Sequence, residues 1–550
     1  MKYQINLFSL ILAFGLFSYK TKAQFSRQDS LLGYLSPARA CYDVKHYDLQ
    51  LRIIPEKKFI SGQNTITYTL NQDTQEIQVD LAPELQIKSI LQNKKSLKFK
   101  REARAVFIRL RKKQNKGSTE KITIVYEGFP KEAKNPPWDG GFVWKKDSQG
   151  NAWIGVACQN VGASIWYPNK DHWSDKPDSV KLTYEVPQDL LAIGNGNLIK
   201  TENLPNNYKR YIWKVSYPIN NYNITLNVGK YAHFTDTYTA QDGSVLALDY
   251  YVLPENLTKA KKQFEQVKPM LACYEKFFDK YPFWNDGFAL VETPYLGMEH
   301  QGAIAYGNKY LQGYLGSDLT GTGIGKMFDF IIIHEAGHEY WGNSVSGDDR
   351  AEMWIHEAFC TYTEALYVEC LWGKEKAFQY VSGWKNIVEN DKPILPPRHV
   401  NQEGSSDMYF KGALMIHTLR NIVANDEKWF AYLKEFYQTF KGKMTNTDEV
   451  MAFWSRKIGM DLVPFFTQYL KFTQIPTFEY KIEGGKFQYR FKADVKDFRM
   501  PILVRFGTTE MMLNASTEWE TIVFDARGGN NSLLNEPFSV RTDLFFVKTK

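Results

Sequence analysis

Apolar and polar residues alternate with a period of two along the first part of the chain. The clearest runs are residues 47–53, 122–126, 182–186 and 211–217. Successive side chains of a strand point to opposite faces, so each run predicts a strand with one buried face. Several such strands at short intervals are typical of an antiparallel β-sandwich, which we expect over residues 24–235. The stretch 135–141, rich in proline and glycine, is expected to form a loop.

The spacing of apolar residues changes to that of helices near residue 255. A helical pattern runs up to Pro282, a strand-like run follows at 288–291, and helical patterns dominate from 325 to about 473. Further helices are expected over residues 411–423, 427–440, 447–458 and 461–471. These patterns predict a mainly helical domain over residues 236–475.

Alternation returns after Pro476. The apolar positions lie within residues 487–491, 502–506, 522–524 and 544–547. This pattern predicts a small β domain over residues 476–550. The fold class expected for the whole chain is therefore multidomain α+β, with a β domain on either side of a mainly helical domain.

The first 23 residues have the features of a secretory signal peptide. Lys2 supplies a positive start, residues 5–17 are apolar but short for a membrane span, and Ala23 ends a cleavage site of small residues. A signal peptide over residues 1–23 predicts an exported protein, either periplasmic or secreted. The alternative is an uncleaved membrane anchor. No later segment is apolar enough to cross a membrane.

Composition and charge exclude some classes of protein. The chain of 550 residues is 43% hydrophobic and 15% aromatic, which is typical of a folded globular protein. Its formal charge is +7, and three of its lysines lie in the predicted signal peptide. Because this charge is mild and no basic stripe is present, nucleic acid is not expected as a partner.

The cysteines do not form an evident disulfide framework. They are Cys41, Cys158, Cys273, Cys360 and Cys370. Cys360 and Cys370 fall on one predicted helix, about 15 Å apart along its axis, which is too far for a disulfide. A Cys41–Cys158 bridge stays open but has no support, and we expect mostly buried free thiols. No pair has zinc-finger spacing.

One motif carries specific chemistry, the sequence His-Glu-Ala-Gly-His at residues 334–338. Residues i and i+4 of a helix lie on one face, so His334 and His338 can bind one metal ion. Glu335 projects beside that face and can hold the attacking water and take its proton. Glu357, which follows after eighteen further residues, fits as the third ligand. Two histidines and a glutamate, with a fourth position open, are a known set for catalytic zinc.

The sequence around the motif predicts the two helices that such a site needs. The apolar run 328–333 leads into the motif, as a buried helix requires. Residues 341–343 then supply a stop, with Gly342 as the expected end of the helix. A second helix is expected over residues 351–371, and it carries Glu357. The bare motif also occurs by chance in chains without metal, and these flanks favour a zinc site.

With these motifs, the chain resembles the aminopeptidase N family of zinc exopeptidases, which are gluzincins. The matching segments, in the family's order, are residues 42–49, 159–181, 296–300, 334–338, 354–357 and 409–412. The resemblance runs from about Tyr42 to past Pro476. It implies a β-sandwich followed by a thermolysin-like catalytic domain, one zinc ion per chain, and peptide substrates with a free N-terminus. We expect a monomer.

The resemblance implies substrate contacts for four residues. Glu299 would bind the α-amine of the substrate, and a peptide without a terminal amine would lose that anchor. Gly297 would let the substrate backbone pass closely, because it has no Cβ. Met298 lies between them in the same motif, and Gln159 would line the first substrate pocket. Without the family, Met298 and Glu299 are only a dipeptide of a surface loop.

The resemblance also implies how the chemistry is divided among the residues. Zinc on its three ligands would lower the pKa of a water and polarise the scissile carbonyl. Glu335 would accept the proton and deliver it to the leaving amine. Tyr409 would donate its hydroxyl to the developing oxyanion. Glu364 would hydrogen-bond a zinc histidine and fix its tautomer.

Three residues depart from the family pattern. Leu296 replaces a glycine, His300 replaces an asparagine, and His356 replaces the asparagine before the third ligand. The long helical C-terminal domain of many relatives does not fit into the remaining residues, 476–550. These departures leave the side-chain preference of the first pocket undetermined.

Three alternatives stay open. An epoxide hydrolase would use the same zinc. A non-catalytic binding scaffold would have lost the ligands or the general base, which this chain keeps. An endopeptidase is opposed mainly by Glu299.

Overall fold

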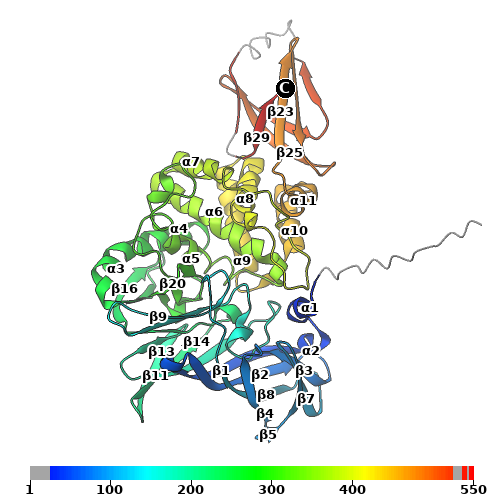
Figure 1. Cartoon of the computed structure of the whole chain (residues 1–550). Helices are drawn as coiled ribbons and strands as arrows, with labels where there is room; N and C mark the ends of the chain where they lie inside the picture. Colours follow the sequence, from blue (N-terminus) through cyan, green and yellow to red (C-terminus); the bar gives the residue numbers. More distant parts are fainter. Residues whose placement is uncertain (1–24, 524–535, 542–543) are drawn as a thin grey trace, which may run out of the picture.

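The protein is built from three parts that follow one another in chain order (Figure 1). The computed structural model describes residues 25–523, 536–541 and 544–550. A β-rich domain lies at one end, a mainly helical domain in the middle, and a small β domain at the other end. The predicted fold class is confirmed. The predicted signal peptide lies outside the described residues.

The N-terminal domain is built on a large sheet. Its strands, in spatial order, are β13 (Asn197–Leu204), β14 (Tyr208–Val215), β11 (Ser179–Pro187), β1 (Tyr42–Ile54), β2 (Phe59–Leu70), β8 (Thr119–Gly128), β4 (Leu85–Gln92) and β5 (Lys95–Ser96). The first three predicted runs lie in β1, β8 and β11, and the run 211–217 extends two residues past the end of β14 at Val215. One pairing differs from the expected antiparallel order, because β1 and β11 run parallel. Alternation reports which face of a strand is buried and not the direction of its neighbour.

Two smaller sheets share a hydrophobic core with this large sheet. One contains β3 (Thr74–Asp80), β7 (Ala105–Gln114) and β6 (Lys98–Glu102), and the other β12 (Leu191–Ile193), β15 (Asn227–Gly229), β10 (Ala152–Ala157) and β9 (Gly141–Lys146). Two short helices, α1 (Arg27–Gly33) and α2 (Pro37–Ala40), precede β1. The expected loop 135–141 lies in the connection between β8 and β9, except that its last residue, Gly141, already begins β9.

The middle domain combines a five-stranded sheet with helices. The strands, in spatial order, are β16 (Ala232–Thr239), β17 (Val245–Val252), β18 (Phe288–Glu292), β20 (Ile304–Tyr306) and β19 (Gly297–Met298). The helices are α3 (Leu257–Gln263), α4 (Val267–Phe277), α5 (Phe330–Gly337), α6 (Met353–Trp372), α7 (Lys374–Trp384), α8 (Phe410–Val423), α9 (Asp426–Phe440), α10 (Thr447–Ile458) and α11 (Val463–Lys471). Residue 235, the expected domain boundary, lies inside β16. A short pair of strands, β21 (Ser346–Gly347) and β22 (Met444–Thr445), joins two loops.

The helix that carries the metal motif is shorter than predicted. Asp329 caps its start by accepting the main-chain N–H groups of Ile331 and Ile332. The helix α5 ends at Gly337, five residues before the expected end at Gly342. Gly342 has a φ of 120°, and a Cβ there would lie 3.3 Å from the ring of His356. This glycine therefore permits a close approach between loop and helix and does not end α5.

The cysteines differ from the expectation in one pair. Cys273 in α4 and Cys370 in α6 form a disulfide, with their Cα atoms 6.0 Å apart. The remaining three cysteines are buried free thiols, as expected. The sequence did not indicate the bridge because its ends are 97 residues apart and meet only when α4 packs on α6. Among the described helices, none combines the length and apolar character that a bilayer span requires.

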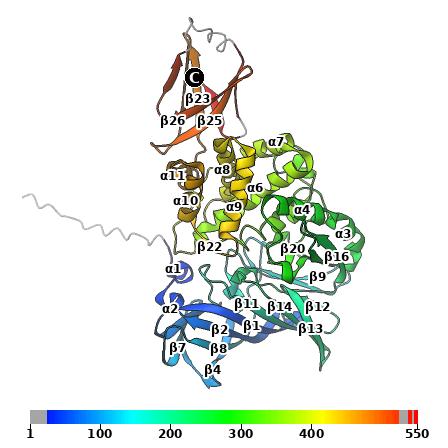
Figure 2. The same ribbon diagram turned by 180° about the vertical axis from the view of Figure 1, so that it is seen from behind.

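The C-terminal domain consists of two small sheets that pack against each other. One contains β27 (Glu520–Val523), β24 (Lys486–Lys492), β23 (Thr477–Glu483) and β29 (Phe546–Thr549), and the other β26 (Thr509–Ser516), β25 (Arg499–Phe506) and β28 (Phe538–Val540). Aromatic rings fill the space between them, for example Phe487 against Phe506 and Phe538. Figure 2 shows that this domain sits on α8 and α11, at the end of the molecule opposite to the N-terminal domain.

Candidate active site

Two helices bring the predicted metal ligands together. His334 lies in α5, His338 directly follows it, and Glu357 lies in the second turn of α6. The Nε2 atoms of the two histidines are 3.2 Å apart. Oε2 of Glu357 lies 3.2 Å from Nε2 of His338 and 3.6 Å from Nε2 of His334. All three side chains are buried, and their three atoms form a nearly regular triangle.

This triangle fits a tetrahedral zinc ion. Metal–ligand bonds of about 2.0–2.1 Å place two ligand atoms of a tetrahedron about 3.3–3.4 Å apart. Oε2 of Glu357 is buried and receives no hydrogen bond from the described residues. A buried carboxylate oxygen in this situation is unfavourable unless a cation faces it. The donor set of two imidazoles and one carboxylate is also one that catalytic zinc uses.

The second nitrogen of each imidazole is already engaged. Nδ1 of His334 donates to Oε1 of Glu364 at 2.7 Å, and Nδ1 of His338 donates to the main-chain oxygen of Trp341 at 2.9 Å. The hydroxyl of Tyr380 donates to the other oxygen of Glu364 at 2.7 Å. These bonds leave Nε2 of both rings free for a metal. Tyr380 was not predicted, because nothing in the sequence distinguishes it from the other tyrosines.

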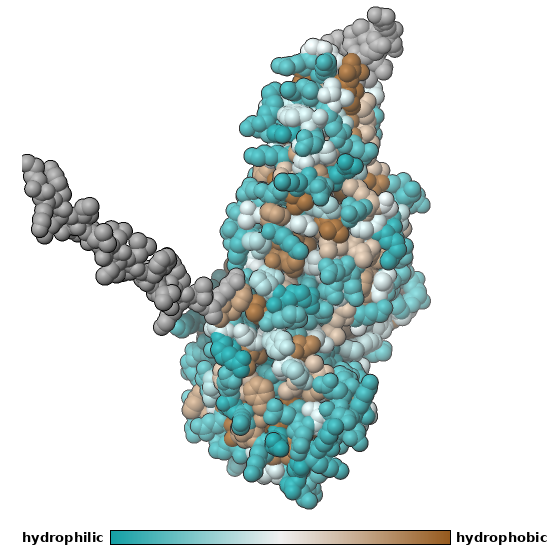
Figure 3. Space-filling view, turned by 90° about the vertical axis from the view of Figure 1, so that its right-hand side faces the viewer, coloured by the Kyte–Doolittle hydropathy of each residue, from teal (hydrophilic) through white to brown (hydrophobic). Residues whose placement is uncertain are grey.

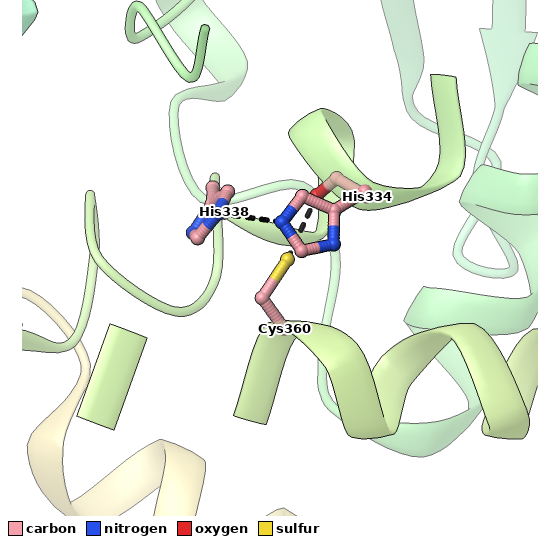
Figure 4. A group of neighbouring side chains, drawn as sticks. All are labelled: His334, His338 and Cys360. Carbon is pink, nitrogen blue, oxygen red and sulfur yellow. Dashed lines mark hydrogen bonds between the residues drawn. The ribbon is translucent and has the colours of Figure 1, made fainter. Parts of the chain in front are cut away.

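Cys360 is a competing candidate for the third ligand. Its thiol and the two histidines each offer a ligand atom within 4.8 Å of the others. Figure 4 shows the thiol projecting from α6 toward the backbone of α5. The thiol donates to the main-chain oxygen of His334 at 2.8 Å, and a Cβ on Gly337 would lie 3.0 Å from Sγ. Because the thiol packs against the helix backbone while Glu357 faces both Nε2 atoms, we infer that Glu357 completes the set.

Glu335 lies beside these ligands in the wall of a cavity. Burial raises the pKa of Glu335 to about 7. A Cβ on Gly297 would come within 2.7 Å of Oε1 of Glu335, so the glycine lets β19 run directly along this carboxylate. Gly297 and Met298 are held in place by pairing with Tyr306 and Ala305 of β20. The structure therefore brings Glu335, Gly297 and Met298 to one site.

Glu299 follows β19 and is almost fully buried. Nε2 of Gln159 donates to Oε1 of Glu299 at 2.5 Å and lies 3.4 Å from Oε1 of Glu357. Gln159 thus links Glu299 to the third metal ligand. Burial raises the pKa of Glu299, and no lysine or arginine of the described ranges pairs with its carboxylate.

The site opens into a cavity of about 460 Å³. Both large domains form its walls, the N-terminal domain with residues 137–138 and 159–160 and the middle domain with α5, β19 and the segment 403–410. Tyr409 lies in this segment, and its ring centre is 6.0 Å from that of His334. Burial raises the pKa of Tyr409 well above its usual value, so its hydroxyl remains a hydrogen-bond donor.

The three departures from the family pattern lie in different places. His356 is fully buried beside Glu357, where Nε2 accepts the N–H of Gly347 at 2.8 Å and the ring stacks on Trp173 at 4.9 Å. Burial lowers the pKa of His356 to about 3, so the ring is neutral. His300 is also fully buried outside the cavity, whereas Leu296 lines it. Of these three, only Leu296 is placed to contact a substrate.

Comparisons with known proteins agree with this geometry. The Peptidase M1 N-terminal domain matches residues 43–222 and the Peptidase family M1 domain matches residues 262–469. Leukotriene A-4 hydrolase of Xenopus laevis is 24% identical over 457 residues, which are 76% of this chain and 69% of that protein. Glutamyl aminopeptidase of Rattus norvegicus is 21% identical over 468 residues, and the match covers 76% of this chain but only 47% of that protein.

Solved structures show the same fold. A mutant M1 zinc metallopeptidase from Deinococcus radiodurans, solved with a Tyr-Ser-Ala substrate, has a TM-score of 0.65 at 20% identity and covers 79% of this chain and 95% of its own. Aminopeptidase A of Legionella pneumophila, in complex with aspartic acid, has a TM-score of 0.71 at 17% identity, covering 88% of this chain and 57% of its own. Fold and site together define a zinc metallopeptidase with a thermolysin-like catalytic domain. The chain belongs to peptidase family M1.

Proposed function

We propose that the protein is a zinc-dependent aminopeptidase, which hydrolyses the first peptide bond of peptides with a free N-terminus. The observation that carries this proposal is the buried carboxylate of Glu299 beside the zinc ligands. Two relatives named glutamyl aminopeptidase and a structural neighbour named aminopeptidase A support it.

Glu299 has the properties of an anchor for the α-amine. Its carboxylate is buried and unpaired by any cation of the described chain, which is unfavourable in isolation. An ammonium group of a substrate would offset that cost and favour the ionised carboxylate. Gln159 holds Oε1 of Glu299 in place, and Glu357 lies next to the same amide. A terminal amine bound here would bring the first peptide bond to the zinc ligands.

The residues around this anchor divide the remaining chemistry. When bound by His334, His338 and Glu357, zinc would supply a Lewis acid that polarises the scissile carbonyl and lowers the pKa of a water. Glu335 accepts the proton of the attacking water and transfers it to the leaving amine. Tyr409 donates a hydrogen bond to the negative charge that develops on the carbonyl oxygen.

A panel of fluorogenic aminoacyl amides tests this function. The purified protein should hydrolyse amides with a free α-amine, lose activity in a metal chelator and regain it with added zinc. N-acetylated versions of the same amides should be poor substrates. The variant Glu299→Ala should lose most activity on free-amine substrates and little on the blocked ones. The activity of Glu299→Gln on free-amine substrates should lie between those of the wild type and Glu299→Ala. Equal losses on both substrate types would refute the anchor.

The same panel separates the alternatives. An epoxide hydrolase would leave the amides intact and open an epoxide, and an endopeptidase would cleave blocked peptides as readily as free ones. A scaffold without activity would show no turnover. Because an epoxide hydrolase would use the same zinc, the metal ligands alone do not select between the two reactions.

We also propose that the protein is exported to the periplasm or secreted. The apolar segment 5–17 after Lys2 and the small residues before Gln24 support this location. The Cys273–Cys370 disulfide also supports it, because such bonds persist in oxidising compartments. Cell fractionation, with mass spectrometry of the mature N-terminus, tests this location. Recovery of the intact chain from the cytoplasm would contradict it.

A monomer is the proposed oligomeric state. On the face shown in Figure 3, hydrophilic residues dominate and hydrophobic ones form small separate clusters. A stable interface between subunits normally needs a larger apolar patch. Light scattering at several concentrations tests this state, and a constant mass of two chains would contradict it.

A further inference from the structure

One loop of the N-terminal domain presents a tryptophan to the active-site cavity. Trp138 is 52% exposed, and it lines the cavity. The loop is firmly held, because the carboxylate of Asp139 accepts the N–H groups of Lys134 at 2.7 Å and Asn135 at 2.9 Å. The main-chain oxygen of Trp138 also accepts the side-chain amide of Asn160 at 3.5 Å. A large indole that is not packed in the core, on a loop whose backbone is held in place, is suited to bind a ligand.

Trp138 lines the same cavity as Glu299, the proposed amine anchor. Its partner Asn160 directly follows Gln159, which bonds Glu299. Met298, the neighbour of Glu299 in the chain, and Met408 line the same cavity. Methionine side chains adapt their shape to an apolar partner. The three side chains therefore give the cavity an apolar and adaptable part of its lining.

The register of β19 indicates which substrate residue each part of the cavity lining would contact. A peptide whose amine is bound at Glu299 and which runs along β19 advances about 3.3 Å per residue. Its first side chain then lies near Met298 and its second near Leu296. A separate group of aromatic rings also lines the cavity with Leu296. In this group, the ring of Phe330 stacks on that of His334 with centres 5.2 Å apart and contacts that of Tyr314 at 5.5 Å. On this register, the first residue of the substrate lies on the Met298 side of the cavity.

The charges of the cavity disfavour an acidic side chain. The carboxylates of its lining are Glu299, Glu335, Glu357 and Glu403, and the lining contains neither lysine nor arginine. Among the charged groups of this lining, an acidic side chain would lie beside four other carboxylates. An apolar side chain would instead bury its surface against the indole and the two thioethers.

We propose that Trp138, with Met298 and Met408, binds the side chain of the first substrate residue and sets a preference for large apolar residues, such as phenylalanine, leucine and methionine. This inference rests on the proposed aminopeptidase activity. Trp138 is then a specificity-determining residue contributed by the N-terminal domain, and the catalytic domain alone would lack it.

The test compares values of kcat/KM for phenylalanyl, leucyl, alanyl and glutamyl amides of one fluorophore. The wild-type enzyme should favour the phenylalanyl and leucyl amides over the other two. In Trp138→Ala the ratio of phenylalanyl to alanyl hydrolysis should fall about tenfold or more, the range for a lost apolar contact in a pocket. Trp138→Phe should keep most of that ratio. Phe129→Ala is a matched control, because Phe129 is 62% exposed, packs on Phe59 and does not line the cavity.

Melting temperatures of all variants show whether a loss of activity reflects unfolding. The ratio of kcat/KM for two substrates is independent of the amount of active enzyme. Inhibition by free phenylalaninamide and alaninamide gives a second, binding-only measurement of the same ratio. An unchanged ratio in Trp138→Ala, or a wild-type preference for the glutamyl amide, would overturn this inference while leaving the aminopeptidase activity intact. A wild-type enzyme without activity on any of these amides would instead overturn the proposed function, and this inference with it.

Discussion

The choice between Glu357 and Cys360 as third zinc ligand leads to opposite expectations for two single variants. The triangle of His334, His338 and Glu357 has edges of 3.2, 3.2 and 3.6 Å, close to the value of about 3.3–3.4 Å for tetrahedral zinc. The thiol of Cys360 is engaged with the main-chain oxygen of His334 at 2.8 Å. To bind zinc, it would have to leave the backbone of α5 and lose a proton.

Glu357→Gln should therefore weaken zinc binding by more than about 100-fold, which corresponds to about 3 kcal/mol. Cys360→Ala is the matched control on the same helix. It should keep one zinc per chain and lower the free energy of unfolding by about 1 kcal/mol, because one buried hydrogen bond is lost. Zinc per chain after dialysis, measured by elemental mass spectrometry, and competition with a chromogenic chelator provide the data. Loss of zinc in Cys360→Ala with retention in Glu357→Gln would falsify the assignment.

Three further variants test other parts of the site. Glu335→Gln should keep zinc but lower kcat by about 10²–10⁴, the usual contribution of a general base, and near-normal kcat would contradict that role. Gly297→Ala would place a Cβ 2.7 Å from Oε1 of Glu335 and 2.9 Å from Cγ2 of Ile331. It should lower kcat about 100-fold at unchanged zinc content, because the carboxylate of Glu335 must move. An unaffected kcat would show that the carboxylate keeps its working position. Glu364→Ala should weaken zinc binding about 10- to 100-fold, because the ring of His334 loses its hydrogen bond to Glu364. Competition with a chelator measures this loss, and an unchanged zinc affinity would argue against a role of Glu364 in holding the ring.

The order of the domains could be predicted from the sequence because it depends on local periodicity. The strands β1, β8, β11 and β14 each bury one face, and the helices of the middle domain bury one stripe, so both leave a regular pattern in the chain. The parallel pairing of β1 with β11 left no such pattern. It depends on which strands become neighbours, and that is decided by packing of the whole domain.

The metal motif could also be recognised locally, because His334 and His338 are one turn apart. The placement of Glu357 opposite them required two helices to pack, and so did the Cys273–Cys370 disulfide between α4 and α6. Tyr380 could not be predicted from the sequence, because its hydrogen bond to Glu364 joins two different helices.

The sequence by itself therefore determined the elements and the chemical types of the site residues. Only the tertiary structure decided which of them meet, and it alone placed Trp138, from a loop of another domain, in one cavity with Glu299 and Gln159. The physical reason is that local conformation follows from neighbouring side chains and hydrogen bonds of one segment, whereas a catalytic cavity is made where distant segments pack and exclude water.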